Sequence, residues 1–201
     1  MGLPGKQRLG GSQAADQMEK LAAKRACELF GADHANMLPC SGTTANLCVY
    51  QAVLQPGDAI LALDPDQISH ASHGRAEHIT GSMYRFIHFG LDEDTLEIDY
   101  DRLGTLLQEH HPKLLVVGVS AYSRLIDYER IEKMAHEAGC VFMVDMAHFS
   151  GLAAAGVVPN PVRYADIVTA SATKTMCSCH TGFILCRENM PRPSTGACIR
   201  A

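Results

Sequence analysis

Short, wholly apolar runs alternate along this chain with segments of helical periodicity. The clearest of these runs is LLVVG, which has no polar side chain and lies within the predicted strand from Lys113 to Val119. A strand that is apolar on both faces has to be covered on both sides, which is typical of a parallel sheet between helices. The alternation therefore predicts an α/β fold, a three-layer domain with a mainly parallel sheet.

The same patterns predict where the helices and strands lie. Helices are expected over residues 16–30, 44–54, 101–110 and 131–138, and strands over 35–38, 59–63, 84–89, 113–119, 140–144, 167–170 and 183–186. Gly31 and Gly139 are expected to end two of the helices. We expect one domain over residues 1–188. Residues 189–201 contain two prolines and have no periodicity, so they are expected to form an irregular tail.

Charge and hydropathy narrow the class of protein. The chain has 22 acidic and 17 basic residues and a net charge of −5, without a basic run. Nucleic-acid binding is therefore not expected. Since no apolar stretch approaches the roughly 20 residues that cross a bilayer, a membrane span is not expected either. The first residues contain no apolar signal region. We expect a cytoplasmic protein.

The eight cysteines are interpreted as reduced thiols. One group lies in apolar periodic segments, where a free cysteine behaves as a small buried residue: Cys27, Cys40, Cys48 and Cys140. A second group lacks the paired spacing of a zinc site: Cys177, Cys179, Cys186 and Cys198. No metal site is predicted.

Polar residues follow two of the predicted strands and precede one of the predicted helices, at positions where α/β proteins bind ligands. Asp145 and His148 come after the strand over 140–144, and Ser171 and Lys174 come after the strand over 167–170. Ligands of open α/β sheets collect at these carboxyl ends. The segment 41–43 (Ser-Gly-Thr) precedes a helix, whose first N–H groups can receive a phosphate.

Each of these features also has an ordinary explanation: a turn residue, a solvated lysine, an N-cap. Together they are the parts that a pyridoxal-phosphate site needs. The helix start would hold the phosphate, and Lys174 would form a Schiff base with the aldehyde. Asp145 would keep the pyridine nitrogen protonated.

Motifs along the chain resemble the serine hydroxymethyltransferase family. The sequence VDMAH at 144–148 and the GL and AAAG that follow it are similar to the family's signature, and collinear similarity extends from Gly2 to about Arg187. Shorter matches include LPGK at 3–6, PGD at 56–58 and SAYS at 120–123. The resemblance implies the large domain of a fold-type I pyridoxal-phosphate enzyme, acting as a homodimer.

The resemblance also implies a role for individual residues. Lys174 would hold pyridoxal phosphate covalently, Asp145 would pair with its ring nitrogen, His148 would contact its phenolic oxygen, and His70 would stack on the ring. Further cofactor contacts are implied for Ser41, Gly42, Thr43, Ser120 and Ser171. The implied reaction interconverts serine and glycine, with tetrahydrofolate as the one-carbon acceptor.

The chain departs from the family's pattern at several positions. Arg8-Leu9 replaces a tyrosine pair, Thr173 replaces the histidine before the lysine, and MCSCHTG at 176–182 replaces LRGPRGG. The family's proton-transfer glutamate and its C-terminal domain, with the arginine that binds the substrate carboxylate, have no counterpart. We therefore expect a large domain that is incomplete at both ends. Two alternatives stay open: an enzyme of the threonine aldolase or transaldolase type, and a truncated, catalytically silent homologue.

Overall fold

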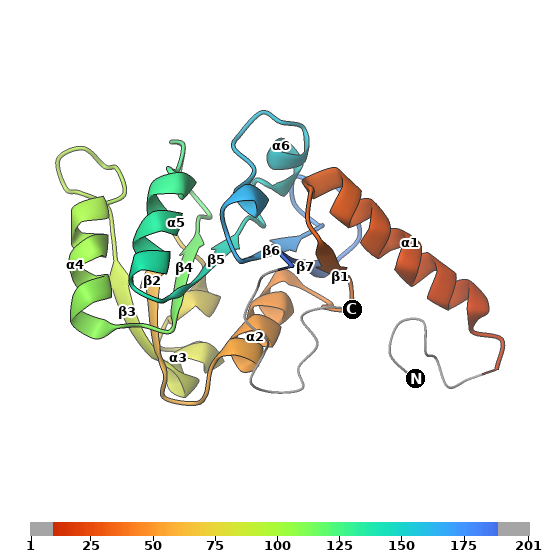
Figure 1. Ribbon diagram of the computed structural model, residues 1–201, viewed down its shortest axis with the longest axis horizontal. Coiled ribbons are helices and arrows are strands. Elements are labelled where there is room, and N and C mark those ends of the chain that lie inside the picture. Colours follow the sequence, from red (N-terminus) through yellow and green to blue (C-terminus); the bar gives the residue numbers. More distant parts are fainter. Residues whose placement is uncertain (1–9, 189–201) are drawn as a thin grey trace.

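The computed structural model describes residues 10–188, which form one seven-stranded sheet with helices on both faces (Figure 1). Its strands are β1 (His34–Asn36), β2 (Ala59–Leu63), β3 (Arg85–Phe89), β4 (Leu114–Gly118), β5 (Val141–Asp145), β6 (Ile167–Ser171) and β7 (Gly182–Cys186). Its α-helices are α1 (Gln13–Phe30), α2 (Gly42–Val53), α3 (Ile79–Met83), α4 (Tyr100–His110), α5 (Tyr128–Glu137) and α6 (Ser150–Ala154). The 3₁₀ helices are η1 (Ala71–His73) and η2 (Pro161–Arg163).

The strand order in the sheet is β1-β7-β6-β5-β4-β2-β3. The five strands from β6 to β3 in this order run parallel, while β7 runs antiparallel to both of its neighbours. The predicted three-layer α/β fold with a mainly parallel sheet is therefore confirmed. Because neighbouring parallel strands end at one edge, the residues after β2, β4, β5 and β6 lie close together.

Alternation along the strands divides the core into two layers. Leu61 and Leu63 of β2 pack in the layer that α4 and α5 cover, whereas Ile60 and Ala62 pack in the layer that α2 covers. In Figure 1, α4 and α5 lie on one side of the sheet and α2 and α3 on the other. The odd-numbered residues of β5 and β6 point toward α2. The side chain of Asp145 therefore points into the layer that α2 covers.

All eleven predicted helices and strands agree with the structure to within three residues at either end. The pattern analysis missed α3, α6, η1 and η2, since helices of three to five residues are too short to show a period. The buried placement predicted for Cys40 is wrong: its side chain is exposed, because it lies in the loop before α2 and not inside an apolar element. Cys140 is buried, and Cys27 and Cys48 are half-buried.

Part of the sequence interpretation lies outside the described residues. This holds for the tail predicted over 189–201, for Cys198, and for the motifs within residues 1–9. Within residues 10–188, no helix combines the length and the apolar character that a bilayer crossing requires. The same residues contain no group of three side chains suited to hold a metal ion.

Candidate active site

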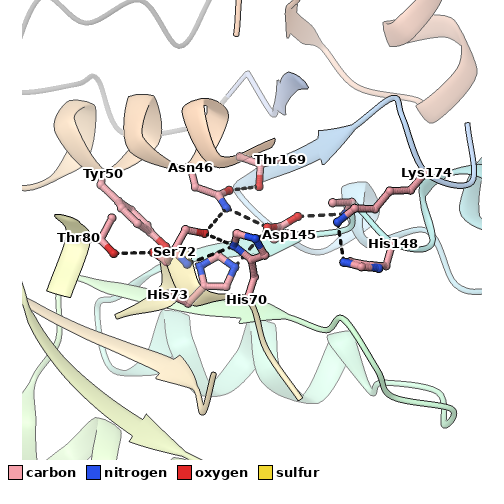
Figure 2. A network of polar contacts seen from close by, with 11 residues as sticks. Asn46, Tyr50, His70, Ser72, His73, Thr80, Asp145, His148, Thr169 and Lys174 are labelled. Atoms are coloured by element: carbon pink, nitrogen blue, oxygen red, sulfur yellow. Dashed lines mark hydrogen bonds and ion pairs between the residues drawn. The ribbon is translucent and has the colours of Figure 1, made fainter. Parts of the chain in front are cut away.

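The carboxyl ends of the central strands bring the predicted site residues into one region. Asp145 is the last residue of β5, Ser171 is the last residue of β6, and Ser120 lies just beyond β4. His70 comes from the loop after β2 and is the N-cap of η1. Figure 2 shows His70, Asp145, His148 and Lys174 side by side. The region therefore gathers residues that are up to 104 positions apart in the chain, from His70 to Lys174.

Asp145 is a buried carboxylate with three hydrogen-bond donors. Its Oδ2 accepts from Nδ2 of Asn46 at 2.9 Å and from Nε2 of His73 at 3.2 Å. Its Oδ1 accepts from the backbone N–H of Ala147 at 3.0 Å. Burial by itself would raise the pKa of Asp145, but the hydrogen bonds from His73, Asn46 and Ala147 outweigh it and lower the pKa to about 2. Asp145 is consequently ionised at neutral pH.

Two of these donors are residues that the sequence interpretation missed as site residues. His73 is completely buried, and its Nδ1 lies 2.7 Å from the hydroxyl of Tyr50. Asn46 is also buried, and its Oδ1 accepts from the hydroxyl of Thr169 at 2.6 Å. Thr169 gave a usable signal, since it is a polar residue in the middle of the apolar strand β6. A buried polar residue is expected to have a partner.

His70 is held in place by the turn that it caps. Its Nδ1 accepts from the backbone N–H of Ser72 at 3.1 Å and lies 2.8 Å from the hydroxyl of the same residue. Burial lowers the pKa of His70. The imidazole is thus held in a single orientation beside Asp145, its ring edge toward His73 at a centroid distance of 6.2 Å.

Lys174 and His148 form a close pair at the end of β6. Nζ of Lys174 lies 2.6 Å from Nε2 of His148. Burial lowers the pKa of Lys174, against the opposing influence of Asp145. Burial and the neighbouring ammonium of Lys174 lower the pKa of His148. A lysine with a lowered pKa is a better nucleophile near neutral pH, because more of it is the free amine.

The loop that carries Lys174 is well anchored in spite of its unusual sequence. The backbone N–H of Cys177 donates to the carbonyl of Lys174 at 2.9 Å, and that of Ser178 donates to the carbonyl of Ala172 at 2.9 Å. The hydroxyl of Thr175 accepts from the backbone N–H of Gly151 at 3.0 Å. The segment 176–182, which departs from the family's sequence, therefore still forms a hydrogen-bonded turn with Lys174.

The start of α2 lies against the ends of β6 and β7. Ser41 is the N-cap, and its hydroxyl accepts from the backbone N–H of Thr44 at 3.0 Å. Gly42 lies beside the end of β6, and a Cβ there would be in ordinary contact with Cβ of Ser171, at 3.4 Å. At Gly182 a Cβ would lie 2.2 Å from the carbonyl oxygen of Ser41, which no side chain could tolerate. Gly42 and Thr43 thus open a helix whose first N–H groups are at the edge of the site.

The two remaining predicted residues help to shape the edge. The backbone N–H of Ser120 donates to the carbonyl of Ile68 at 2.7 Å and joins the loop after β4 to the loop after β2. The hydroxyl of Ser171 lies 2.6 Å from that of Thr173. Thr173 stands at the family's histidine position, so in this chain the hydroxyl of Ser171 has a hydroxyl partner on the lysine loop.

These side chains are a chemical match for pyridoxal phosphate. A carboxylate offers about four lone-pair sites, two on each oxygen, and side chains and backbone within residues 10–188 occupy three of those on Asp145. The fourth, on Oδ1, remains available for a protonated ring nitrogen. The amine of Lys174 and the start of α2 supply the other two groups that the cofactor requires, an attachment point and a phosphate site.

Comparison with known proteins identifies the family of this chain. Residues 1–195 match the family model described as serine hydroxymethyltransferase. A protein of Koribacter versatilis (strain Ellin345) named serine hydroxymethyltransferase is 47% identical over 187 residues, which are 93% of this chain. The aligned part is 44% of that relative's length, so the chain spans less than half of it. The extent of both matches shows that this chain belongs to the serine hydroxymethyltransferase family.

Proposed function

We propose that this chain binds pyridoxal phosphate at Lys174 and provides the cofactor-binding part of an enzyme that interconverts serine and glycine. Tetrahydrofolate would be the one-carbon acceptor, and the working form would be a homodimer in the cytoplasm. One observation carries the proposal. A lysine with a lowered pKa and a carboxylate with one open lone pair lie together at neighbouring strand ends, beside a helix N-terminus.

Each group would have a distinct task in this site. When bound, the cofactor supplies an electron sink for the bonds around the amino acid's α-carbon. Asp145, ionised and buried, would keep a proton on the ring nitrogen, and Lys174 would be the covalent attachment point. His70 and His148 would orient the ring from its face and from its edge. Ser41, Gly42 and Thr43 would bind the phosphate through backbone N–H groups and hydroxyls.

Ser120 and Ser171 would complete the boundary of the cofactor pocket. The backbone hydrogen bond from Ser120 to Ile68 joins two loops at this boundary, and Ser171 lies beside Gly42 at the start of α2. The family assignment favours the serine-glycine reaction over a threonine aldolase or transaldolase reaction. The test below distinguishes this reaction from the threonine reactions and from a catalytically silent homologue.

The test combines a binding assay with a reaction that needs no folate. Purified protein is titrated with pyridoxal phosphate and followed by visible absorbance, and deuterium uptake into glycine in heavy water is then measured. Lys174→Ala should abolish both the visible band and the uptake. Lys24→Ala, at an exposed lysine on α1, is the matched control and should change neither.

The outcomes separate the candidate functions. Serine and threonine are then assayed with tetrahydrofolate present. Cofactor binding with glycine exchange and serine turnover supports the proposal, while turnover of threonine alone would favour the aldolase type. A protein that binds the cofactor but exchanges no glycine proton would be the silent homologue. If wild-type protein shows no visible band, or if Lys174→Ala retains it, the proposed cofactor site is wrong.

A further inference from the structure

Two hydrogen-bond chains each include one residue of α2 and end on the same oxygen of Asp145 (Figure 2). One runs from Tyr50 through His73, and the other from Thr169 through Asn46. Asn46 and Tyr50 are one helical turn apart, so both point at the sheet. Asp145 and Thr169 are odd-numbered residues on the face that α2 covers. The two chains thus follow from the periods of the helix and of the strands.

The hydrogen-bond accounting assigns the proton positions along the first chain. Burial raises the pKa of Tyr50 well above its ordinary value, so Tyr50 is a phenol that can donate. Asp145 is a carboxylate, which only accepts. His73 therefore has a donor facing Nδ1 and an acceptor facing Nε2. That combination fits the neutral imidazole with its proton on Nε2.

A charged His73 would leave this accounting unbalanced. Its Nδ1–H would have to donate to Tyr50, and the phenol's own hydrogen would then need another acceptor. Among residues 10–188, the structure gives the Tyr50 oxygen one hydrogen-bond partner, Nδ1 of His73. An O–H that is buried without an acceptor is unfavourable, because it has lost its hydrogen bond to water. The arrangement accordingly disfavours an imidazolium at His73.

We infer that Tyr50 and His73 are positioning residues for Asp145: the Tyr50 hydroxyl holds His73 neutral, and neutral His73 leaves the charge of Asp145 uncompensated. A charged imidazolium at 3.2 Å would compete with the cofactor's ring nitrogen for the same carboxylate. A neutral one donates a hydrogen bond and fixes the carboxylate plane without cancelling its charge. The cofactor part of this inference rests on the proposed function.

Close packing supports a positioning role. Gly118 of β4 lies under the contact, and a Cβ there would come within 2.9 Å of both Cβ of Asp145 and Nε2 of His73. The histidine is also fixed through its backbone, since its carbonyl oxygen lies 3.0 Å from Nε2 of His88. Titratable groups that face His73 from the surrounding elements are Tyr50, His70, His78, His88 and Asp145.

The direct test is the protonation state of His73 without cofactor. Histidine labelled with ¹⁵N distinguishes a ring nitrogen that carries a proton from one that does not. The His73 signals are assigned through ring-to-Cβ correlations and by their absence in His73→Gln. At about pH 6, just below the ordinary histidine pKa, wild-type protein should show a bare Nδ1 and a protonated Nε2.

Two matched variants follow in the same spectrum. Tyr50→Phe removes only the hydroxyl, and His73 should then become protonated on both nitrogens. Tyr84→Phe removes a hydroxyl from a neighbouring ring 5.9 Å away and should match wild type. A proton on Nδ1 in the wild type, or a Tyr50→Phe spectrum identical to wild type, overturns the inference.

Cofactor binding gives an independent readout. Tyr50→Phe should bind pyridoxal phosphate on the order of 10-fold more weakly, as expected for a disturbed hydrogen bond to a charged group, whereas Tyr84→Phe should bind normally. Unchanged affinity in Tyr50→Phe would remove the link to Asp145. If wild-type protein binds no cofactor at all, the proposed function fails, while the ¹⁵N result still decides the state of His73.

Discussion

Replacing Asp145 by asparagine removes one charge and keeps the shape of the side chain, so it measures what the ionised carboxylate contributes to folding. The pKa of Asp145 is about 2 in the folded protein against an ordinary 3.8. Since the folded-state pKa is the lower one, the carboxylate stabilises the fold above the ordinary value and loses this effect as pH falls toward about 2. The difference corresponds to about 2 kcal/mol at pH 7.

The magnitude is measured by urea unfolding of wild-type protein and Asp145→Asn across a pH series. At pH 7 the variant should be less stable by about 2 kcal/mol, the contribution of the ionised carboxylate. The asparagine amide also destabilises the fold, because its N–H faces the donors that bind Asp145. The gap should shrink by about 1 kcal/mol as the pH falls to about 3. The comparison of two variants cancels the titration of the other acidic residues. A gap that stays constant from pH 7 to about 3 would refute the lowered pKa.

Three further predictions concern the packing and the reactivity of the site. Gly182→Ala should destabilise the protein by roughly 3 kcal/mol or more, because its Cβ would collide with the Ser41 carbonyl. Gly42→Ala should cost less than about 1 kcal/mol, because its Cβ would make an ordinary contact with Ser171. Equal losses of stability in chemical denaturation would contradict this prediction. Ser41→Ala should lose about 1 kcal/mol through its N-cap, whereas unchanged stability would argue against the cap. The rate of covalent pyridoxal-phosphate attachment should rise with pH and level off below the pKa of an ordinary lysine, since the pKa of Lys174 is lowered; a stopped-flow profile that keeps rising to that pKa would rule this out.

Sequence patterns were sufficient for the sheet because its central strands are buried on both faces. The apolar runs of β4 and β5 have no competing interpretation as surface structure, and their bounds were predicted to within one residue. The five-residue helices α3 and α6 were missed, since tertiary contacts and not periodicity determine them. Cys40 was misplaced for a related reason, because a short apolar run continues past the strand into an exposed loop.

The site was partly accessible from the sequence. Asp145, Lys174 and Ser41 could be singled out because strand ends and helix starts are recognisable and parallel strands end at one edge. The tasks of His70 and His148 came from the family resemblance and remain proposals.

The supporting network of Asn46, Tyr50 and His73 could not be predicted from spacing. Its members meet only because α2 crosses the sheet face to which Asp145 points. That choice of face depends on the three-dimensional packing of helix on sheet, which a one-dimensional pattern does not contain.

The attachment of the cofactor to Lys174 is tested most directly by chemical trapping. The protein is incubated with pyridoxal phosphate, reduced with borohydride so that the link to the amine becomes permanent, digested, and mapped by mass spectrometry. The account predicts one dominant modified peptide, with the pyridoxyl group on Lys174. Modification spread over exposed lysines such as Lys24 and Lys133, with Lys174 unmodified, would contradict it.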